Sequence, residues 1–103
     1  MSKPVALTEE QIARAMTDLP GWTYDNHKLT KTFVFGGFKE ALSFIVRLGL
    51  HAEEMQHHPE ICNVYNTVTL SLSTHDAGDR VTAKDHELGK IIESFQWTDP
   101  PRK

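Results

Sequence analysis

Apolar positions recur with two different periods along this chain, and the changes of period outline its elements. Steps of three and four residues indicate a helix from Phe38 to about Gln56. A first helix is predicted after Thr8, a candidate N-cap that would share a capping box with Gln11. A last helix is predicted after Thr82, with its apolar stripe at Leu88, Ile91, Ile92 and Phe95.

Two-residue alternation predicts β-strands between these helices. A short strand at Trp22–Asp25 and a second at Leu29–Phe35 are joined by a turn-rich segment, which is typical of a hairpin. The long run Ile61–Thr74 is rich in β-forming residues, and we divide it into two strands near Asn66. In this run we expect four residues to face the core: Val64, Val68, Leu70 and Leu72.

The resulting order is helix, two strands, helix, two strands, helix. Hairpins without long crossovers give an antiparallel sheet, which amphipathic helices can cover on one side. The pattern therefore predicts an α+β domain of two layers, in which three helices pack on one face of a four-stranded antiparallel sheet. Residues 1–6 and 97–103 are interpreted as a lead-in and a tail.

The helix predicted at 38–56 carries more apolar residues than one face can hold. Its main stripe would be Phe38, Ala41, Leu42, Ile45, Leu48, Ala52 and Met55. Phe44, Val46 and Leu50 lie off that stripe. A chain this short cannot cover a helix on all sides, so we favour a self-association surface over burial within one monomer.

Composition narrows the class of protein. A chain of 103 residues with 39% apolar content has room for a single domain, which we place at 1–103. The net charge of −3, without a Lys/Arg cluster, argues against a nucleic-acid or anionic-membrane partner. The single cysteine suits a reducing compartment, and no apolar run or leader is evident. We expect a cytoplasmic protein that gains stability by forming a homo-oligomer.

Histidines stand at the ends of the predicted elements. His57 and His58 precede Pro59, which cannot continue the helix, and His75 ends a strand. Imidazole gives and takes protons near neutral pH, and the Asp85 carboxylate at the start of the last helix could orient one ring. No Ser or Cys has an evident base partner. The set therefore favours elimination, hydration or isomerisation over acyl transfer.

These residues belong to a longer ordered pattern. It consists of Glu53, His57-His58-Pro59, then Asn63, Tyr65, Asn66 and Val68, then Leu72-Ser73-Thr74-His75, and finally Asp85. In this pattern the chain resembles the pterin-4a-carbinolamine dehydratases. The resemblance implies the same α+β architecture, often as a dimer or tetramer.

The resemblance also implies an activity. Members of the family remove water from 4a-hydroxytetrahydropterin to give the quinonoid dihydropterin, as a step in tetrahydropterin recycling. His57 and His75 would then be general acid and base, in an order left open, and His58 would contact the ring. The pterin is the substrate, so no cofactor and no metal are expected.

Substrate-binding residues follow from the same resemblance. Two segments would present backbone amides and carbonyls to the pterin, and they include Gln56, Ser73, Thr74 and Asp76. Glu53, one helical turn before His57, would face the same pocket, and Trp22 would wall the flat ring. Two departures from the family pattern concern Gln56, which replaces an acid common before His-His-Pro, and Asp85, which lies about one residue further from His75.

Other readings stay open beside this one. His57 and His58 could serve only as caps for the last carbonyls of their helix, and Asp85 only as a capping residue. His51, Glu54 and His58 have a spacing that could hold a metal ion. A protein-interaction module, using the open sheet face and the second helix, is the alternative function. An open cleft where the histidines converge favours the enzyme over that module.

Overall fold

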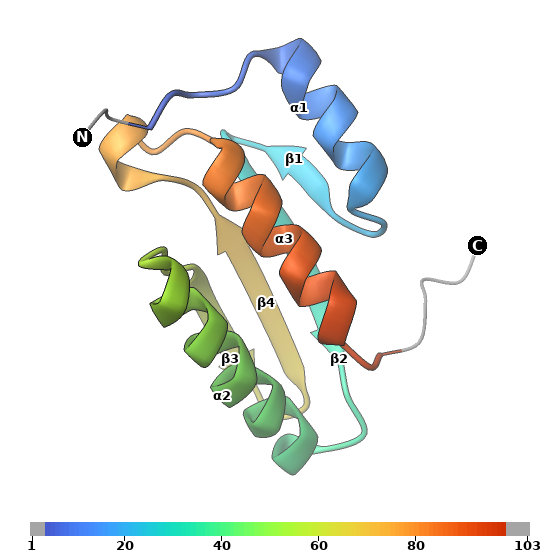
Figure 1. The fold of residues 1–103 in the computed structure, drawn as a ribbon. Coiled ribbons are helices and arrows are strands. Elements are labelled where there is room, and N and C mark those ends of the chain that lie inside the picture. The colour runs from blue at the N-terminus through green and yellow to red at the C-terminus, as the bar shows by residue number, and fades with distance from the viewer. Residues whose placement is uncertain (1–3, 99–103) are drawn as a thin grey trace.

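The computed structural model describes residues 4–98. The chain runs through α1 (Glu9–Ala15), a 3₁₀ turn at Met16–Asp18, β1 (Thr23–Asp25), β2 (Lys28–Val34), α2 (Phe38–Met55), β3 (Glu60–Val64), β4 (Thr67–Leu72), the 3₁₀ turn η2 (His75–Ala77) and α3 (Ala83–Phe95). Figure 1 shows α2 and α3 side by side across one face of the sheet, with α1 near β1. Residues 1–3 and 99–103 of the predicted lead-in and tail lie outside the described part.

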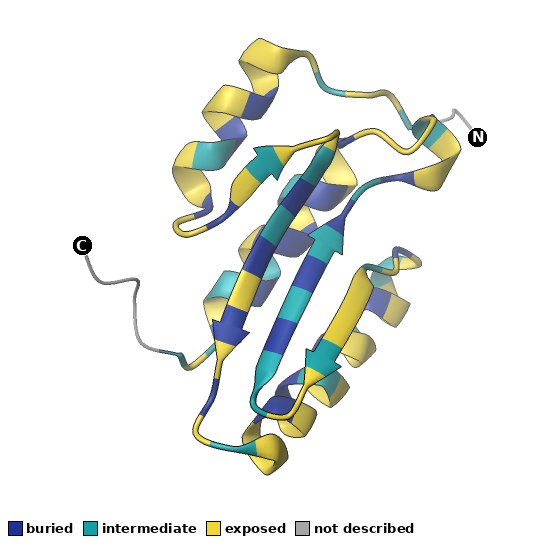
Figure 2. Ribbon diagram, turned by 180° about the vertical axis from the view of Figure 1, so that it is seen from behind, coloured by how far each residue is buried: buried dark blue, intermediate teal, exposed yellow. Residues whose placement is uncertain are grey.

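The four strands form one open antiparallel sheet in the order β1-β2-β4-β3. Along β2 and β4 buried residues alternate with more exposed ones, as Figure 2 shows from the open side. The buried set faces the helices and includes Leu29, Phe33, Val68, Leu70 and Leu72. The predicted fold class, an α+β domain with its helices on one face of a four-stranded antiparallel sheet, is confirmed.

The predicted capping box and the predicted N-cap Thr82 are both present, and Thr82 forms a capping box of its own. Thr8 pairs with Gln11 at the start of α1, and Thr82 pairs with Asp85 at the start of α3. The division of the long β run is confirmed too, because a turn at Tyr65–Asn66 separates β3 from β4. The Tyr65 backbone there has φ 51°, in the left-handed region.

Two details of the predicted core were wrong. Phe44 was placed off the apolar stripe of α2, yet it is fully buried together with Ala41, Leu48 and Ala52. Phe38 and Leu42 were placed on that stripe, and both are exposed. Val64 is also exposed, because it lies opposite Thr67 on the open face of the sheet.

The end of α2 directs the chain toward the site. Gln56 takes up the left-handed conformation with φ 54°, and the Gln56 and His57 amides donate to the carbonyls of Glu53 and Ala52 at 3.1 and 3.0 Å. These two bonds form a Schellman motif, which reverses the chain at the helix end. The end of α2, the start of β3, η2 and the start of α3 therefore meet at one end of the sheet (Figure 1).

Candidate active site

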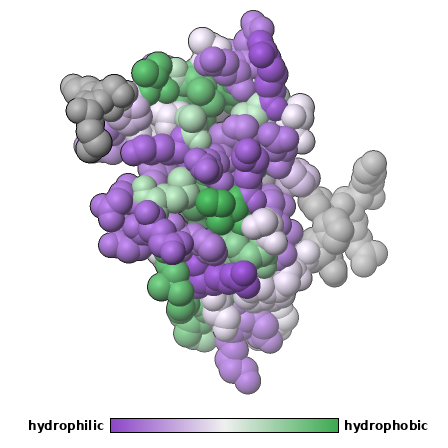
Figure 3. All heavy atoms as spheres, in the orientation of Figure 1, coloured by the Kyte–Doolittle hydropathy of each residue, from purple (hydrophilic) through white to green (hydrophobic). Residues whose placement is uncertain are grey.

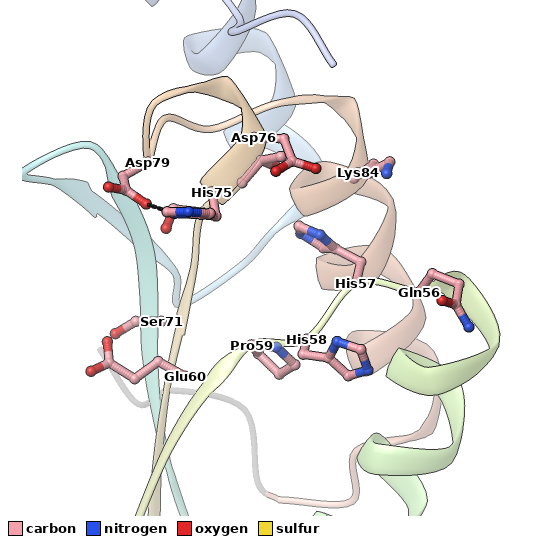
Figure 4. A pocket seen from close by; sticks show the side chains of 12 residues that line it. Gln56, His57, His58, Pro59, Glu60, Ser71, His75, Asp76, Asp79 and Lys84 are labelled. Carbon is pink, nitrogen blue, oxygen red and sulfur yellow. Dashed lines mark hydrogen bonds and ion pairs between the residues drawn. The ribbon is translucent and has the colours of Figure 1, made fainter. Parts of the chain in front are cut away.

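A cavity of about 410 Å³ opens at this end of the sheet. Two segments form most of its wall: residues 56–60, after α2, and residues 73–76 with Asp79, after β4. Ser71 and Lys84 complete the lining. Figure 4 shows the imidazole of His75 on the η2 side, and those of His57 and His58 on the side of the segment that follows α2. The three histidines predicted to form the site therefore line one cavity.

His57 is the most deeply held of these histidines. Only 8% of its side chain is exposed, and its Nε2 lies 2.5 Å from Oδ1 of Asp85. A carboxylate can only accept a hydrogen bond, so Nε2 carries the hydrogen. The other ring nitrogen, Nδ1, is not the one that contacts Asp85.

Asp85 is fully buried behind His57 and does not line the cavity. Its second oxygen accepts hydrogen bonds from the Thr74 hydroxyl and the Thr82 amide, each at 2.8 Å. The hydroxyls of the two threonines lie 2.7 Å apart. Asp85 is thus both a capping residue and the partner of His57, so the two roles left open from the sequence are combined in one carboxylate.

His58 differs from His57 in being exposed. Its Nε2 lies 2.7 Å from Oε1 of Glu53, and 63% of its side chain is accessible to solvent. Glu53 does not line the cavity, so the expectation that it faces the same pocket as His57 was wrong. The chain reversal at Gln56 turns His58 back toward the end of α2, and Glu53 contacts the histidine from outside.

His75 lies on η2 with its side chain almost fully exposed. Its Nδ1 lies 3.1 Å from Oδ1 of Asp79. The hydrogen bond and the charge of Asp79, with a further contribution from the charge of Asp76, raise the pKa of His75 above its ordinary value. Each of the three histidines therefore contacts a carboxylate through one ring nitrogen.

Most other residues expected at the substrate do line the cavity. Gln56, Ser73, Thr74 and Asp76 are all part of its wall. Trp22 is not, because its ring is buried and packs against Phe33 with the centroids 6.1 Å apart. The expectation that Trp22 forms a wall of this cavity was therefore wrong.

The position of Trp22 is explained by a buried polar partner. Its indole nitrogen donates to Glu93 at 2.9 Å, and Lys31 donates to the same carboxylate oxygen at 2.7 Å. An indole N–H is buried without loss only where such an acceptor exists. Trp22 thus links the start of β1 to α3 and belongs to the core.

Replacement of Trp22 by phenylalanine is expected to lower the free energy of unfolding by about 1–3 kcal/mol, since a hydrogen bond to a charged group is lost. Substrate KM should stay unchanged because the ring is remote from the cavity. Urea denaturation and steady-state kinetics measure the two quantities. Tyr24→Phe, which removes only an exposed contact to His27, is the matched control. A raised KM in Trp22→Phe would contradict this prediction and indicate that Trp22 contributes to substrate binding.

Sequence reasoning missed Asp79, Lys84, Glu60, Ser71 and Pro59 as lining residues. Pro59 and Glu60 directly follow the histidine pair, so their proximity was a usable signal. Ser71 points to the open face of β4 opposite Glu60. Lys84 and Asp79 had no such signal, because their positions depend on how the loop at 75–82 folds.

The metal alternative finds no geometric support. Within residues 4–98, no three histidine, cysteine or acidic side chains lie together as ligands of one ion. His51 instead stacks on Phe95, with the ring centroids 5.0 Å apart, while His58 contacts Glu53.

Within residues 4–98, no helix combines the length and apolar character needed to cross a bilayer.

Fold and cavity together define an α+β protein with a cavity lined by three histidines. Residues 5–95 match the family described as pterin 4 alpha carbinolamine dehydratase. The chain therefore belongs to the pterin-4a-carbinolamine dehydratase family.

Individual relatives agree with this assignment. A protein of Opitutus terrae named for that dehydratase is 48% identical over 94 residues, which are 91% of this chain and 97% of the relative. A similarly named protein of Sulfolobus acidocaldarius is 47% identical over 90 residues, 87% of this chain and 98% of the relative. A crystal structure from Brucella melitensis, described as a transcriptional coactivator/pterin dehydratase, has a TM-score of 0.82 at 33% identity and covers 86% of this chain and 96% of that one.

Proposed function

We propose that the protein dehydrates 4a-hydroxytetrahydropterin to the quinonoid dihydropterin by general acid–base catalysis with His57 and His75, and so serves tetrahydropterin recycling. The observation that carries the proposal is the convergence of His57, His58 and His75 on one open cavity. Family membership and the names of the relatives support a pterin-4a-carbinolamine dehydratase.

The reaction needs two proton transfers. The C4a–O bond breaks as the 4a-hydroxyl takes up a proton and leaves as water. N5 loses its hydrogen, and the electron pair of that bond forms the N5–C4a double bond. One imidazole supplies the first proton and the other accepts the second, so no net proton is consumed.

The two rings are suited to this exchange because one nitrogen of each ring contacts a carboxylate and the other nitrogen does not. Nε2 of His57 contacts Asp85 and Nδ1 of His75 contacts Asp79. Each carboxylate fixes the hydrogen on the nitrogen it touches, so the opposite nitrogen can give or take a proton. His58 is proposed to contact the ring, and the segments at 56–58 and 73–76 to bind its polar edge.

The direct test is turnover of a freshly generated 4a-hydroxytetrahydropterin by the purified protein. Formation of the quinonoid product, followed by absorbance, should be faster than the uncatalysed loss of water and should rise in proportion to enzyme concentration. A rate independent of added protein would reject the proposed function. It would leave the protein-interaction alternative, for which the exposed apolar residues of α2 are the supporting feature.

The same residues support a proposed homodimer or homotetramer. The outer face of α2 carries three apolar residues at four-residue steps, Leu42, Val46 and Leu50. Their exposed fractions are 46%, 57% and 66%, respectively. Figure 3 shows apolar surface on the side of the molecule where α2 lies. Exposed apolar patches of this kind mark association sites.

Val46→Glu is expected to shift the protein toward monomer by burying a charge in that contact. Sedimentation velocity at several concentrations measures the shift. Val5→Glu introduces the same charge at an exposed valine outside α2 and should leave the assembly unchanged. Equal sedimentation of Val46→Glu and wild type would place the contact elsewhere.

A further inference from the structure

We propose that Asp79 is a positioning residue, which holds the His75 ring with its hydrogen on Nδ1 and leaves Nε2 free for the substrate. The proposal rests on the proposed dehydration. Its starting point is the 3.1 Å contact between Nδ1 of His75 and Oδ1 of Asp79, which Figure 4 shows beside the cavity. Both residues line that cavity.

The backbone holds the Asp79 carboxylate in this place. Gly78 and Asp79 both have positive φ, 73° and 61°. The left-handed region is unfavourable for a residue with a side chain, and Asp and Asn tolerate it best. Two such residues in succession turn the chain back toward η2, which brings the carboxylate beside His75.

The turn is closed by main-chain hydrogen bonds to one buried residue. The Asp79 amide donates to the Thr74 carbonyl at 3.1 Å, and the Thr74 amide donates to the Arg80 carbonyl at 2.8 Å. Thr74 is also the residue whose hydroxyl donates to Asp85 at 2.8 Å. One threonine therefore anchors both carboxylates, the one behind His57 and the one beside His75.

Charge around His75 favours its protonated form. Asp79 and Asp76 are the acidic groups that act on it, and they raise its pKa. Glu60, on β3, is a further acid in the cavity wall, while Lys84 on α3 and the histidines after α2 are the cations and potential cations there. Asp79 is the only one of these groups within the described chain that hydrogen-bonds to the ring.

The test compares Asp79→Asn and Asp79→Gly with wild type. Both remove the carboxylate, and both tolerate a positive φ, so a shared effect is not due to the loop. Asp18→Asn is the matched control, because Asp18 contacts Nε2 of His86 at 2.9 Å outside the cavity. Nitrogen–proton NMR of the imidazoles reports the tautomer and pKa of His75, and kcat and KM are measured across pH.

Both Asp79 variants should lower the pKa of His75, because both remove the negative charge. Asp79→Gly, which also removes the acceptor oxygen, should in addition reduce the share of the ring with hydrogen on Nδ1. The limb of the kcat profile that belongs to His75 should move to lower pH, and kcat should fall by about 3–10-fold because an exposed pair contributes less than a buried one. KM should change little. Asp18→Asn should alter none of these quantities.

Unchanged His75 resonances, or an unchanged kcat profile, in both Asp79 variants would overturn the positioning role. Failure of the proposed function is recognised separately. In that case His75→Ala itself turns over like wild type, or the wild-type protein has no activity. If His75→Ala loses activity while both Asp79 variants behave like wild type, only the role of Asp79 is rejected.

Discussion

Replacing His57 or His75 with alanine is expected to lower the kcat of dehydration by about 10²–10⁴-fold, the usual effect of losing a general acid or base. Each substitution removes an imidazole that lines the cavity while leaving the backbone of its segment in place. His75 is exposed, so its loss should leave the fold unchanged. His57→Ala keeps the main-chain Schellman bonds but leaves the buried Asp85 without one hydrogen-bond partner, so its free energy of unfolding should fall. Stopped-flow measurement of product formation, with circular dichroism to check folding, gives the result.

His86→Ala is the matched control for both variants. His86 also contacts an aspartate, Asp18, but lies outside the histidine-lined cavity. Its loss should leave kcat within about twofold of wild type, as expected for a group with no part in the proton transfers. Wild-type turnover of His57→Ala and His75→Ala would reject the assignment of both histidines.

Removal of the Asp85 side chain is expected to have the largest effect on stability. Asp85→Ala leaves the His57 ring, the Thr74 hydroxyl and the Thr82 amide without their buried acceptor. Each buried group left without its partner costs about 1–3 kcal/mol, and loss of the capping box about 1 kcal/mol, so a total loss of roughly 3–5 kcal/mol is expected. Urea denaturation followed by circular dichroism measures the change in unfolding free energy.

Glu87→Ala is a suitable comparison because Glu87 is an exposed acid on the same helix. A surface change of this kind is expected to stay within about 0.5 kcal/mol. Should Asp85→Ala be too unstable to purify, Asp85→Asn keeps the side-chain shape and allows the same measurement. A loss below about 1 kcal/mol in both Asp85 variants would contradict a structural role for this carboxylate.

Much of the fold could be predicted because local signals and packing agree. Capping residues marked the starts of α1 and α3, and the turn at Tyr65–Asn66 interrupted the β period where the strands divide. The face of α2 was harder to predict. Apolar residues lie nearly all round this helix, so periodicity alone could not show that Phe44 is buried and Leu42 exposed.

Val64 shows a different limit. In antiparallel pairing with β4, Ile61 and Asn63 face the helices, whereas Val64 faces the open side. The apolar character of Val64 suggested the opposite phase. Register is a property of two strands together, so a single strand without strict alternation does not determine it.

The site divides in the same way. The three histidines were predictable because they stand at the ends of regular elements, which meet at one end of the sheet. Asp79 was not, because its contact with His75 depends on two left-handed residues in a loop without period. Trp22 was misplaced because its partner Glu93 lies 71 positions further along the chain.

Asp85 and Asp79 lie in different surroundings, and this difference decides which of them can be replaced to change the working pH of the protein. Asp85 is buried in the interior, so a substitution there that changed the chemistry of the site would also lower the stability of the fold. Asp79 lies at the rim with 68% of its side chain open to water, and residues that accept its positive φ, such as Asn and Gly, can replace it without strain. A library aimed at a shifted working pH should therefore begin at the rim and leave the interior untouched.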